Sequence, residues 1–171
     1  MAKTAATLNQ ESSALQAQEG KYLTFNLDQE GYGIEILKVR EIIGIMNITQ
    51  IPQMPPYVKG LINLRGKVIP VIDLRLKFDL AGAAYNDRTC IIVVEVENNG
   101  GATLMGVVVD SVSEVLNINA EDIEPSPRFG TLVATDYIMG MAKTKGGLKT
   151  LLDLHRVLTT NELAALKELA T

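Results

Sequence analysis

The stretch from Gly60 to Arg75, GLINLRGKVIPVIDLR, constrains the fold of this chain more than any other. Its two apolar segments are rich in β-branched residues, and Arg65-Gly66-Lys67 separates them. Gly66 can adopt the positive φ that a tight turn needs, so the pattern predicts a β-hairpin with Arg65 at its turn. Because Pro70 has no N–H to donate to a ladder, the second strand is predicted to be an edge strand or to carry a bulge there.

Other strands are predicted where short apolar runs alternate with polar residues between turn signals. Asp73 can cap a short helical turn that ends near Phe78, and residues 37–43 are interpreted as a helical turn that runs into a strand. Pro52, Pro55 and Pro56 indicate a loop. The further predicted strands are residues 22–27, 32–36, 45–51, 90–96, 103–110, 137–142 and 148–154.

The sequence contains an internal repeat. One match relates residues 60–74 to residues 140–154, and it places Lys145 where the first half has Arg65. A second match relates residues 33–42 to residues 106–115. Glycine and aliphatic residues often coincide in β-rich chains, but two matches in the same order, each with an acidic residue, favour a duplication. The matched pairs are Gly33/Gly106, Val39/Val112, Glu41/Glu114, Ile42/Val115, Gly60/Gly140, Gly66/Gly146, Ile72/Leu152, Asp73/Asp153 and Leu74/Leu154.

The repeat predicts a mostly β protein made of two packed barrels. Each half holds about five short strands, too few to fold well alone, and strands this short close most naturally into small barrels. We expect the barrels to divide at about residues 20–85 and 86–158, with a groove between them. Whether each barrel uses only the strands of its own half cannot be read from the sequence.

The two ends of the chain are predicted to differ from its centre. Residues 1–19 are small and polar, which predicts a flexible N-terminal tail. Residues 159–171 are predicted to form a C-terminal helix, because Thr159-Thr-Asn-Glu162 is a capping box. The apolar stripe of that helix would consist of Leu163, Leu166 and Leu169.

Composition excludes several classes of protein. The hydrophobic content of 47% is enough for a buried core, and no apolar run approaches the length of a membrane helix. The net charge is −4, the basic residues are scattered and tryptophan is missing, which disfavours nucleic-acid binding. One cysteine excludes an intramolecular disulfide, and no secretory signal is present, so a cytoplasmic protein is expected.

The chain shows no constellation for catalysis, and we predict no catalytic residue, metal site or cofactor. His155 is the one histidine and has no second ligand at metal-binding spacing, while Cys90 leads an apolar strand. Residues 117–128 resemble a calcium loop only faintly, because Asp122 stands where glycine is needed and Arg128 where glutamate is needed. Phosphate-binding and dinucleotide-binding glycine motifs are missing. An enzyme with an unfamiliar site remains the alternative.

The remaining candidates are binding surfaces. Arg65 at the hairpin turn could be an ordinary solvated turn residue, but its guanidinium beside Val39 and Ile62 would suit an acidic or amphipathic partner. Glu41 could simply face water from an edge strand, or it could pair with Arg65 and fix the register of a docked helix. Grooves with an apolar floor and a charged rim commonly hold helical partners.

The residues of this chain closely resemble the CheW coupling-protein family of bacterial chemotaxis. The resemblance covers roughly residues 20–158, and its most specific part is NLRG followed by PVIDLR. It implies two SH3-like five-stranded barrels with short helical turns, in agreement with the repeat. The segments that carry it are YGIEILKVREI (32–42), Ile51-Pro52, YVKGLINLRG (57–66), IPVIDLR (69–75) and GVVVDSVSEV (106–115).

The resemblance also implies a function. Family members are adaptors that link the helical cytoplasmic tips of chemoreceptors to the regulatory domain of the histidine kinase CheA, in arrays at the inner face of the membrane. A regulatory domain of a larger kinase or of a receiver-bearing protein is the alternative. Gly60 lies in a region that affects kinase contacts. The positions that match receptor contacts are Val39, Glu41, Arg65, Ile91 and Val115.

Overall fold

The computed structural model describes residues 18–98, 101–124 and 137–158, together with Glu162, Ala165, Leu166 and Glu168. The tail predicted over residues 1–19 lies outside the described residues except at its last two positions. The helix predicted over residues 159–171 also lies largely outside them, although the four described residues there have helical backbone. Its predicted stripe residues Leu163 and Leu169 are not described, whereas Leu166 is buried.

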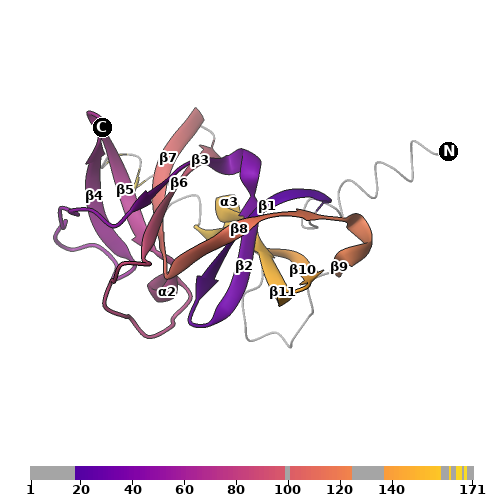
Figure 1. Cartoon of the computed structure of the whole chain (residues 1–171). Coiled ribbons are helices and arrows are strands. Elements are labelled where there is room, and N and C mark those ends of the chain that lie inside the picture. The colour runs from indigo at the N-terminus through magenta and orange to yellow at the C-terminus, as the bar shows by residue number, and fades with distance from the viewer. Residues whose placement is uncertain are drawn as a thin grey trace.

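Strands dominate the chain, and the prediction of a mostly β fold with short helical turns is confirmed (Figure 1). The first group of elements is β1 (Gly20–Leu27), β2 (Glu30–Glu35), η1 (Ile36–Lys38), β3 (Val39–Gly44), β4 (Val58–Leu64), β5 (Lys67–Asp73) and α2 (Leu74–Lys77). The second group is β6 (Cys90–Asn98), β7 (Gly101–Val109), β8 (Ser111–Ile118), η2 (Ala120–Asp122), β9 (Ile123–Glu124), β10 (Ile138–Thr144), β11 (Gly147–Leu152) and α3 (Leu154–Val157).

These strands form two sheets that exchange strands between the halves of the sequence. One sheet has five strands in the order β3-β6-β7-β5-β4, and the other has six in the order β8-β1-β2-β11-β10-β9. The five-stranded sheet therefore uses one continuous stretch, and the six-stranded sheet uses the chain before and after it. A boundary near residue 85 would cut the five-stranded sheet, so the predicted units of residues 20–85 and 86–158 exchange strands, which is the alternative that the sequence left open.

The strand exchange follows from two short crossings. The chain passes from β2 through η1 into β3, and β3 pairs with β6 of the other sheet. In the same way the chain passes from β7 directly into β8, which pairs with β1. The third strand of each half of the sequence therefore belongs to a different sheet from the first two strands of that half.

Each sheet closes towards a barrel where its two edges meet. In the six-stranded sheet, η2 links edge strand β8 to the opposite edge strand β9. In the five-stranded sheet, the segment between β3 and β4 forms one isolated bridge, Thr49 to Leu61. The prediction of a full strand over residues 45–51 is therefore wrong. The backbone there pairs at one position only, just before the loop of Pro52, Pro55 and Pro56.

The internal repeat is visible in the structure as two equivalent units. β4, β5 and α2 correspond to β10, β11 and α3 at the spacing of the sequence match. β5 pairs in parallel with β7, and β11 pairs in parallel with β2. Gly106 and Gly33 occupy the same register position in these two pairs, opposite Val71 and Leu151. The two sheets are therefore related by an approximate twofold relationship.

The local predictions around the central hairpin hold in part. Asp73 caps α2, since its Oδ1 accepts a hydrogen bond of 2.9 Å from the backbone N–H of Arg75. Pro70, however, is neither in an edge strand nor at a bulge, because β5 lies between β7 and β4 and the register shift occurs in β4, between Val58 and Gly60. The missing N–H is tolerated because pairing with β7 begins only at Val71.

Most of the buried apolar side chains lie between the two sheets. The largest cluster draws members from both, including Phe25 and Ile34 of the six-stranded sheet and Ile72 and Val94 of the five-stranded one. Leu166 joins this cluster from the C-terminal segment. Because the same apolar surface is removed from water by both sheets, the two units form one core and are held together chiefly by the hydrophobic effect.

Candidate partner-binding site

The turn between β4 and β5 presents Arg65 to solvent. Arg65 and Gly66 both have positive φ, of 50° and 87°, as a two-residue hairpin turn of this hand requires. Asn63 stabilises the turn, because its Oδ1 accepts a hydrogen bond of 2.9 Å from the N–H of Gly66. The Arg65 side chain is 70% exposed, so its guanidinium is available to a partner.

Arg65 and Glu41 form an ion pair, which was one of the two alternatives that the sequence left open for Glu41. Arg65 Nη1 donates to Glu41 Oε2 at 3.0 Å, and Nη2 donates to Oε1, so the contact is bidentate. The pair connects the β4–β5 turn to β3, at opposite ends of the order of the five-stranded sheet. Its hydrogen bond with Arg65 lowers the pKa of the Glu41 carboxyl, and the same contact raises the pKa of Arg65.

The lowered pKa of Glu41 predicts a specific titration. We expect its carboxyl to protonate at lower pH than an ordinary glutamate in an NMR-monitored titration, and Arg65→Ala to move the pKa back up. Because the folded-state pKa is depressed, any stabilisation by the pair is present above the unfolded-state pKa and is lost as pH falls through the folded-state value. A Glu41 titration that is unchanged in Arg65→Ala would show that the pair does not form in solution.

The ion pair borders a cavity of about 630 Å³ at the end of the five-stranded sheet. Its apolar lining comes from Ile69, Val93, Leu64, Leu104 and Ala102. Its charged lining comes from Arg40, Glu41, Arg65, Lys67 and Glu95. This arrangement of an apolar floor with a charged rim can receive an apolar side chain of a partner while the rim contacts flanking polar groups.

A second ion pair lies on the same rim and was not predicted. Arg40 Nη2 contacts Glu95 Oε2, which connects β3 to β6. Lys67, the third cation of the rim, has no ion pair within the described part of the chain. Sequence reasoning missed these residues because Arg40 and Glu95 lie fifty-five positions apart and belong to no motif. Only the pairing of β3 with β6 brings them together.

Val39 stands at the start of β3, between this rim and the core. It is partly buried and packs against the large cluster between the sheets. The register with β6 shifts between Val39 and Glu41, so Arg40 is an extra residue in β3. The bulge reorients the chain just before Glu41. Because Val39 is partly buried, only part of its side chain is accessible to a partner.

The other predicted contact positions do not join this group. Val115 lies on β8 of the six-stranded sheet, opposite Leu23, and is 49% exposed. Within the described residues no hydrogen bond or ion pair connects it to Arg65 or Glu41. Ile91 is fully buried inside the five-stranded sheet, so a partner could reach it only after a conformational change, and its role as a receptor contact stays a prediction. The continuous apolar run of residues 91–94, which is typical of a strand buried on both faces, could have indicated this burial.

Gly60, the predicted kinase-binding position, is a buried backbone position in β4. Its φ is +140°, and a Cβ there would lie 2.0 Å from the carbonyl oxygen of Thr49. Thr49 is bridged to the neighbouring Leu61 by two backbone hydrogen bonds, of 2.8 and 2.9 Å. Because glycine has no Cβ, Gly60 lets the backbone of Thr49 lie against β4, and this contact closes the five-stranded sheet. Gly60 offers no side chain to a partner, and any effect on binding would be indirect.

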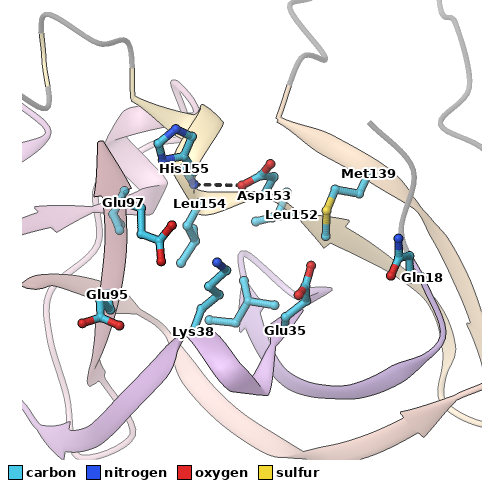
Figure 2. A pocket seen from close by; sticks show the side chains of 12 residues that line it. Gln18, Glu35, Lys38, Glu95, Glu97, Met139, Leu152, Asp153, Leu154 and His155 are labelled. Atoms are coloured by element: carbon cyan, nitrogen blue, oxygen red, sulfur yellow. Dashed lines mark hydrogen bonds between the residues drawn. The ribbon is translucent and has the colours of Figure 1, made fainter. Parts of the chain in front are cut away.

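A second cavity, of about 410 Å³, lies between the two sheets (Figure 2). It is lined by Ile34, Glu35, Met139 and Leu152 of the six-stranded sheet, by Glu95, Val96 and Glu97 of β6, and by Gln18, Lys38, Asp153, Leu154 and His155. None of the five predicted receptor-contact residues lines it. The predicted groove between the barrels therefore exists as a cavity, but Glu41 and Arg65 line the other one.

His155 and Cys90, which were considered as catalytic or metal-binding residues, lie at or near the ends of secondary-structure elements. His155 is exposed in the first turn of α3, where its backbone N–H donates to Asp153 Oδ1 at 3.0 Å. Cys90 begins β6 and is partly buried. Among the described residues no group of three or more His, Cys, Asp or Glu side chains could hold a metal ion. No helix in that part of the chain is long and apolar enough to cross a membrane.

Comparisons with known proteins agree on one family. The CheW-like domain matches residues 21–162. The chemotaxis protein CheW of Klebsiella aerogenes is 41% identical over 150 residues, covering 88% of this chain and 88% of that protein. CheW of Treponema pallidum is 30% identical over 156 residues, covering 91% and 92%. The crystal structure of scaffolding protein TtCheW from Thermoanaerobacter tengcongensis superposes with a TM-score of 0.75 at 36% identity, covering 85% of this chain and 97% of that one.

Proposed function

Since this chain belongs to the CheW-like family of chemotaxis proteins, we propose that it is a non-enzymatic adaptor that couples chemoreceptors to the histidine kinase CheA. Its relatives are named as chemotaxis and scaffolding proteins, which supports a scaffold in a chemotaxis system. The two partners, and the place of action in receptor arrays at the inner face of the membrane, are part of the proposal. The regulatory domain of CheA and the helical cytoplasmic tip of a receptor are the two partners to test.

The observation that carries the receptor half of the proposal is the Arg65–Glu41 pair beside the apolar cavity. An exposed guanidinium held by one carboxylate keeps a fixed orientation, and its remaining N–H groups can donate to acidic or carbonyl groups of a helix. The partly exposed Leu64 and Leu104 of the cavity lining can contact an aliphatic side chain from the same helix. We propose that Arg65 and Glu41 orient the receptor helix and that the exposed part of Val39 packs against it.

Replacement of Arg65 tests this assignment. Arg65→His should weaken binding of a receptor cytoplasmic fragment about tenfold, because the shorter imidazole cannot form the bidentate contact with Glu41. Stability should change by less than about 1 kcal/mol, since the pair is exposed and histidine tolerates the positive φ of this turn better than most residues. Isothermal titration with the receptor fragment and thermal unfolding measure the two effects.

The repeat supplies a matched control for this experiment. Lys145 occupies the same turn position in the other unit, and no ion pair joins it to Glu114 within the described residues. Lys145→His should leave receptor affinity unchanged, and both variants should still bind the CheA regulatory domain. A large loss of thermal stability in Arg65→His, or equal loss of affinity in the two variants, would contradict the assignment. A wild-type protein that binds neither partner would contradict the adaptor function itself.

A further inference from the structure

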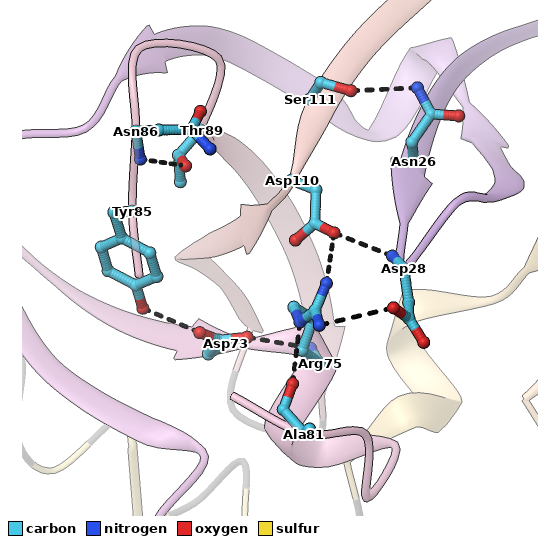
Figure 3. Close-up of polar contacts among 10 residues, drawn as sticks. All are labelled: Asn26, Asp28, Asp73, Arg75, Ala81, Tyr85, Asn86, Thr89, Asp110 and Ser111. Carbon is cyan, nitrogen blue, oxygen red and sulfur yellow. Dashed lines mark hydrogen bonds and ion pairs between the residues drawn. The ribbon is translucent and has the colours of Figure 1, made fainter. Parts of the chain in front are cut away.

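The repeat places two equivalent contact regions between the sheets, one near α2 and one near α3, and we call each of them a seam. The side chains at the two seams differ. At the first, Arg75 of α2 reaches the six-stranded sheet (Figure 3). Its Nη1 lies 2.5 Å from Asp110 Oδ2, and its Nη2 lies 3.5 Å from Asp28 Oδ1. Its Nε donates to the carbonyl oxygen of Ala81 at 2.9 Å. We call this group of contacts the Arg75 clasp.

The Arg75 clasp connects segments that belong to different sheets. Asp28 lies in the turn between β1 and β2, whereas Arg75 follows β5 and Asp110 joins β7 to β8. Asp110 Oδ2 also accepts a hydrogen bond of 2.8 Å from the backbone N–H of Asp28. The same carboxylate therefore contacts both Arg75 and the turn between β1 and β2. The Arg75 side chain is only 13% exposed, which strengthens these charged contacts relative to surface pairs.

The second seam involves the equivalent strands, but its side chains and the backbone that carries them differ, since Glu97 lies within β6 and Leu37 lies in η1. Arg75 corresponds to His155 by the spacing of the repeat, and Asp110 corresponds to Leu37. Thr24 and Val93 are equivalent, because they pair with the equivalent glycines Gly33 and Gly106. Counting four positions on from each of them shows that Asp28 corresponds to Glu97.

At this second seam the part of the chain that the structure describes shows no counterpart of the Arg75 clasp. Within the described residues no ion pair joins His155 to an acidic side chain. The cavity of about 410 Å³ lies here, and Figure 2 shows His155 and Glu97 among the side chains that line it. The imidazole of His155 is shorter than a guanidinium side chain, and Leu37 supplies no charge where the first seam has Asp110.

We propose that Arg75 is a positioning residue that fixes the orientation of the two sheets at one seam, and thereby sets the arrangement of β3 and β8 that a partner meets. The apolar core between the sheets favours their contact but is not directional. A buried guanidinium with three partners in fixed directions supplies the orientation. The inference rests on the proposed adaptor function in one respect: a receptor helix would contact the half-exposed Val115 of β8 as well as Arg65 and Glu41 of the five-stranded sheet, so its affinity depends on how the two sheets are oriented.

Arg75→Met tests the proposal, since methionine keeps most of the side-chain length and removes the charge. Amide hydrogen exchange should become at least about fivefold faster in the β1–β2 turn and in α2, and receptor-fragment affinity should fall about fivefold. Arg75→Lys should give exchange rates and a receptor affinity between those of the wild-type protein and Arg75→Met, because an ammonium group cannot reach three partners at once. The control is Arg156→Met, which removes an ion pair of 3.6 Å to Asp153 within one segment and should change neither readout.

Rescue at the other seam separates orientation from local stability. His155→Arg, added to Arg75→Met, should pair with Glu97, slow exchange at the second seam and restore receptor affinity. Affinity in Arg75→Met equal to that of the control, or faster exchange spread evenly over both sheets, would overturn the proposal. If the wild-type protein bound no receptor fragment, the proposed function would fail, and the localised exchange with its rescue by His155→Arg would still decide whether Arg75 orients the sheets.

Discussion

Replacement of Gly60 by alanine is expected to lower the free energy of unfolding by roughly 3 kcal/mol. Two costs combine at this position. The backbone has a φ of +140°, which L-residues rarely adopt, and the added Cβ would lie 2.0 Å from a backbone oxygen of Thr49. Because that oxygen belongs to the bridge with Leu61, the contact cannot be relieved by a side-chain rotation. Chemical denaturation followed by circular dichroism measures the loss.

Gly66 supplies the matched control for this experiment. It also has positive φ, but nothing lies within 4 Å of the position of its Cβ. Gly66→Ala should therefore cost about 1 kcal/mol, the backbone term alone. Equal destabilisation of the two variants would show that the close approach to Thr49 is not important. A stable Gly60→Ala that no longer binds the CheA regulatory domain would show that Gly60 affects the kinase contact directly.

Truncation of Ile91 to alanine is expected to destabilise the protein by roughly 2–4 kcal/mol. Ile91 is fully buried among Ile62, Ile69 and Val71, and its Cγ2 is the atom nearest to a Cβ that would be added at Gly106. Strands β6 and β5, which carry Ile91, Ile69 and Val71, are paired on both sides, so they cannot readily collapse into the cavity that truncation leaves. If Ile91 has no direct contact with a partner, any loss of partner binding in Ile91→Ala should be proportional to the fraction of the protein that is unfolded.

Val115 provides the comparison, because it is a β-branched strand residue that was predicted for the same role. It is half exposed on β8, so Val115→Ala should change stability by less than about 0.5 kcal/mol. If Val115 contacts a receptor, affinity for the receptor fragment should fall with stability unchanged. Stable Ile91→Ala protein with weakened binding would instead show that the buried position contacts the partner through a conformational change.

These pairs of variants distinguish two kinds of site residue. Arg65, Glu41 and Val115 have side chains that solvent, and therefore a partner, can reach. Gly60 and Ile91 are buried, so we expect their replacement to act through the integrity of the five-stranded sheet. A screen for loss of function would recover both kinds, so only a measurement of stability beside each measurement of binding separates them.

Much of the local structure could be predicted from the sequence because its causes are local. The turn at Arg65 and Gly66 follows from the φ preference of glycine between two apolar strands. The cap of α2 by Asp73 follows from a side chain two residues from its donor. The repeat could be read because corresponding residues occupy equivalent positions in both units. Even the Glu41–Arg65 pair was among the alternatives, since both residues stood beside apolar strands.

The sequence by itself therefore determined the hairpins, the caps and the mostly β, duplicated character of this protein. The tertiary structure alone decided which strands share a sheet, that Ile91 is buried, and that Arg40 meets Glu95. It also decided that Arg75 pairs with Asp110 between the sheets, whereas its counterpart His155 has no ion pair among the residues that the structure describes. The physical reason is that turns and caps depend on neighbours a few residues apart, whereas strand exchange, burial and ion pairs between sheets depend on contacts between residues far apart in the chain.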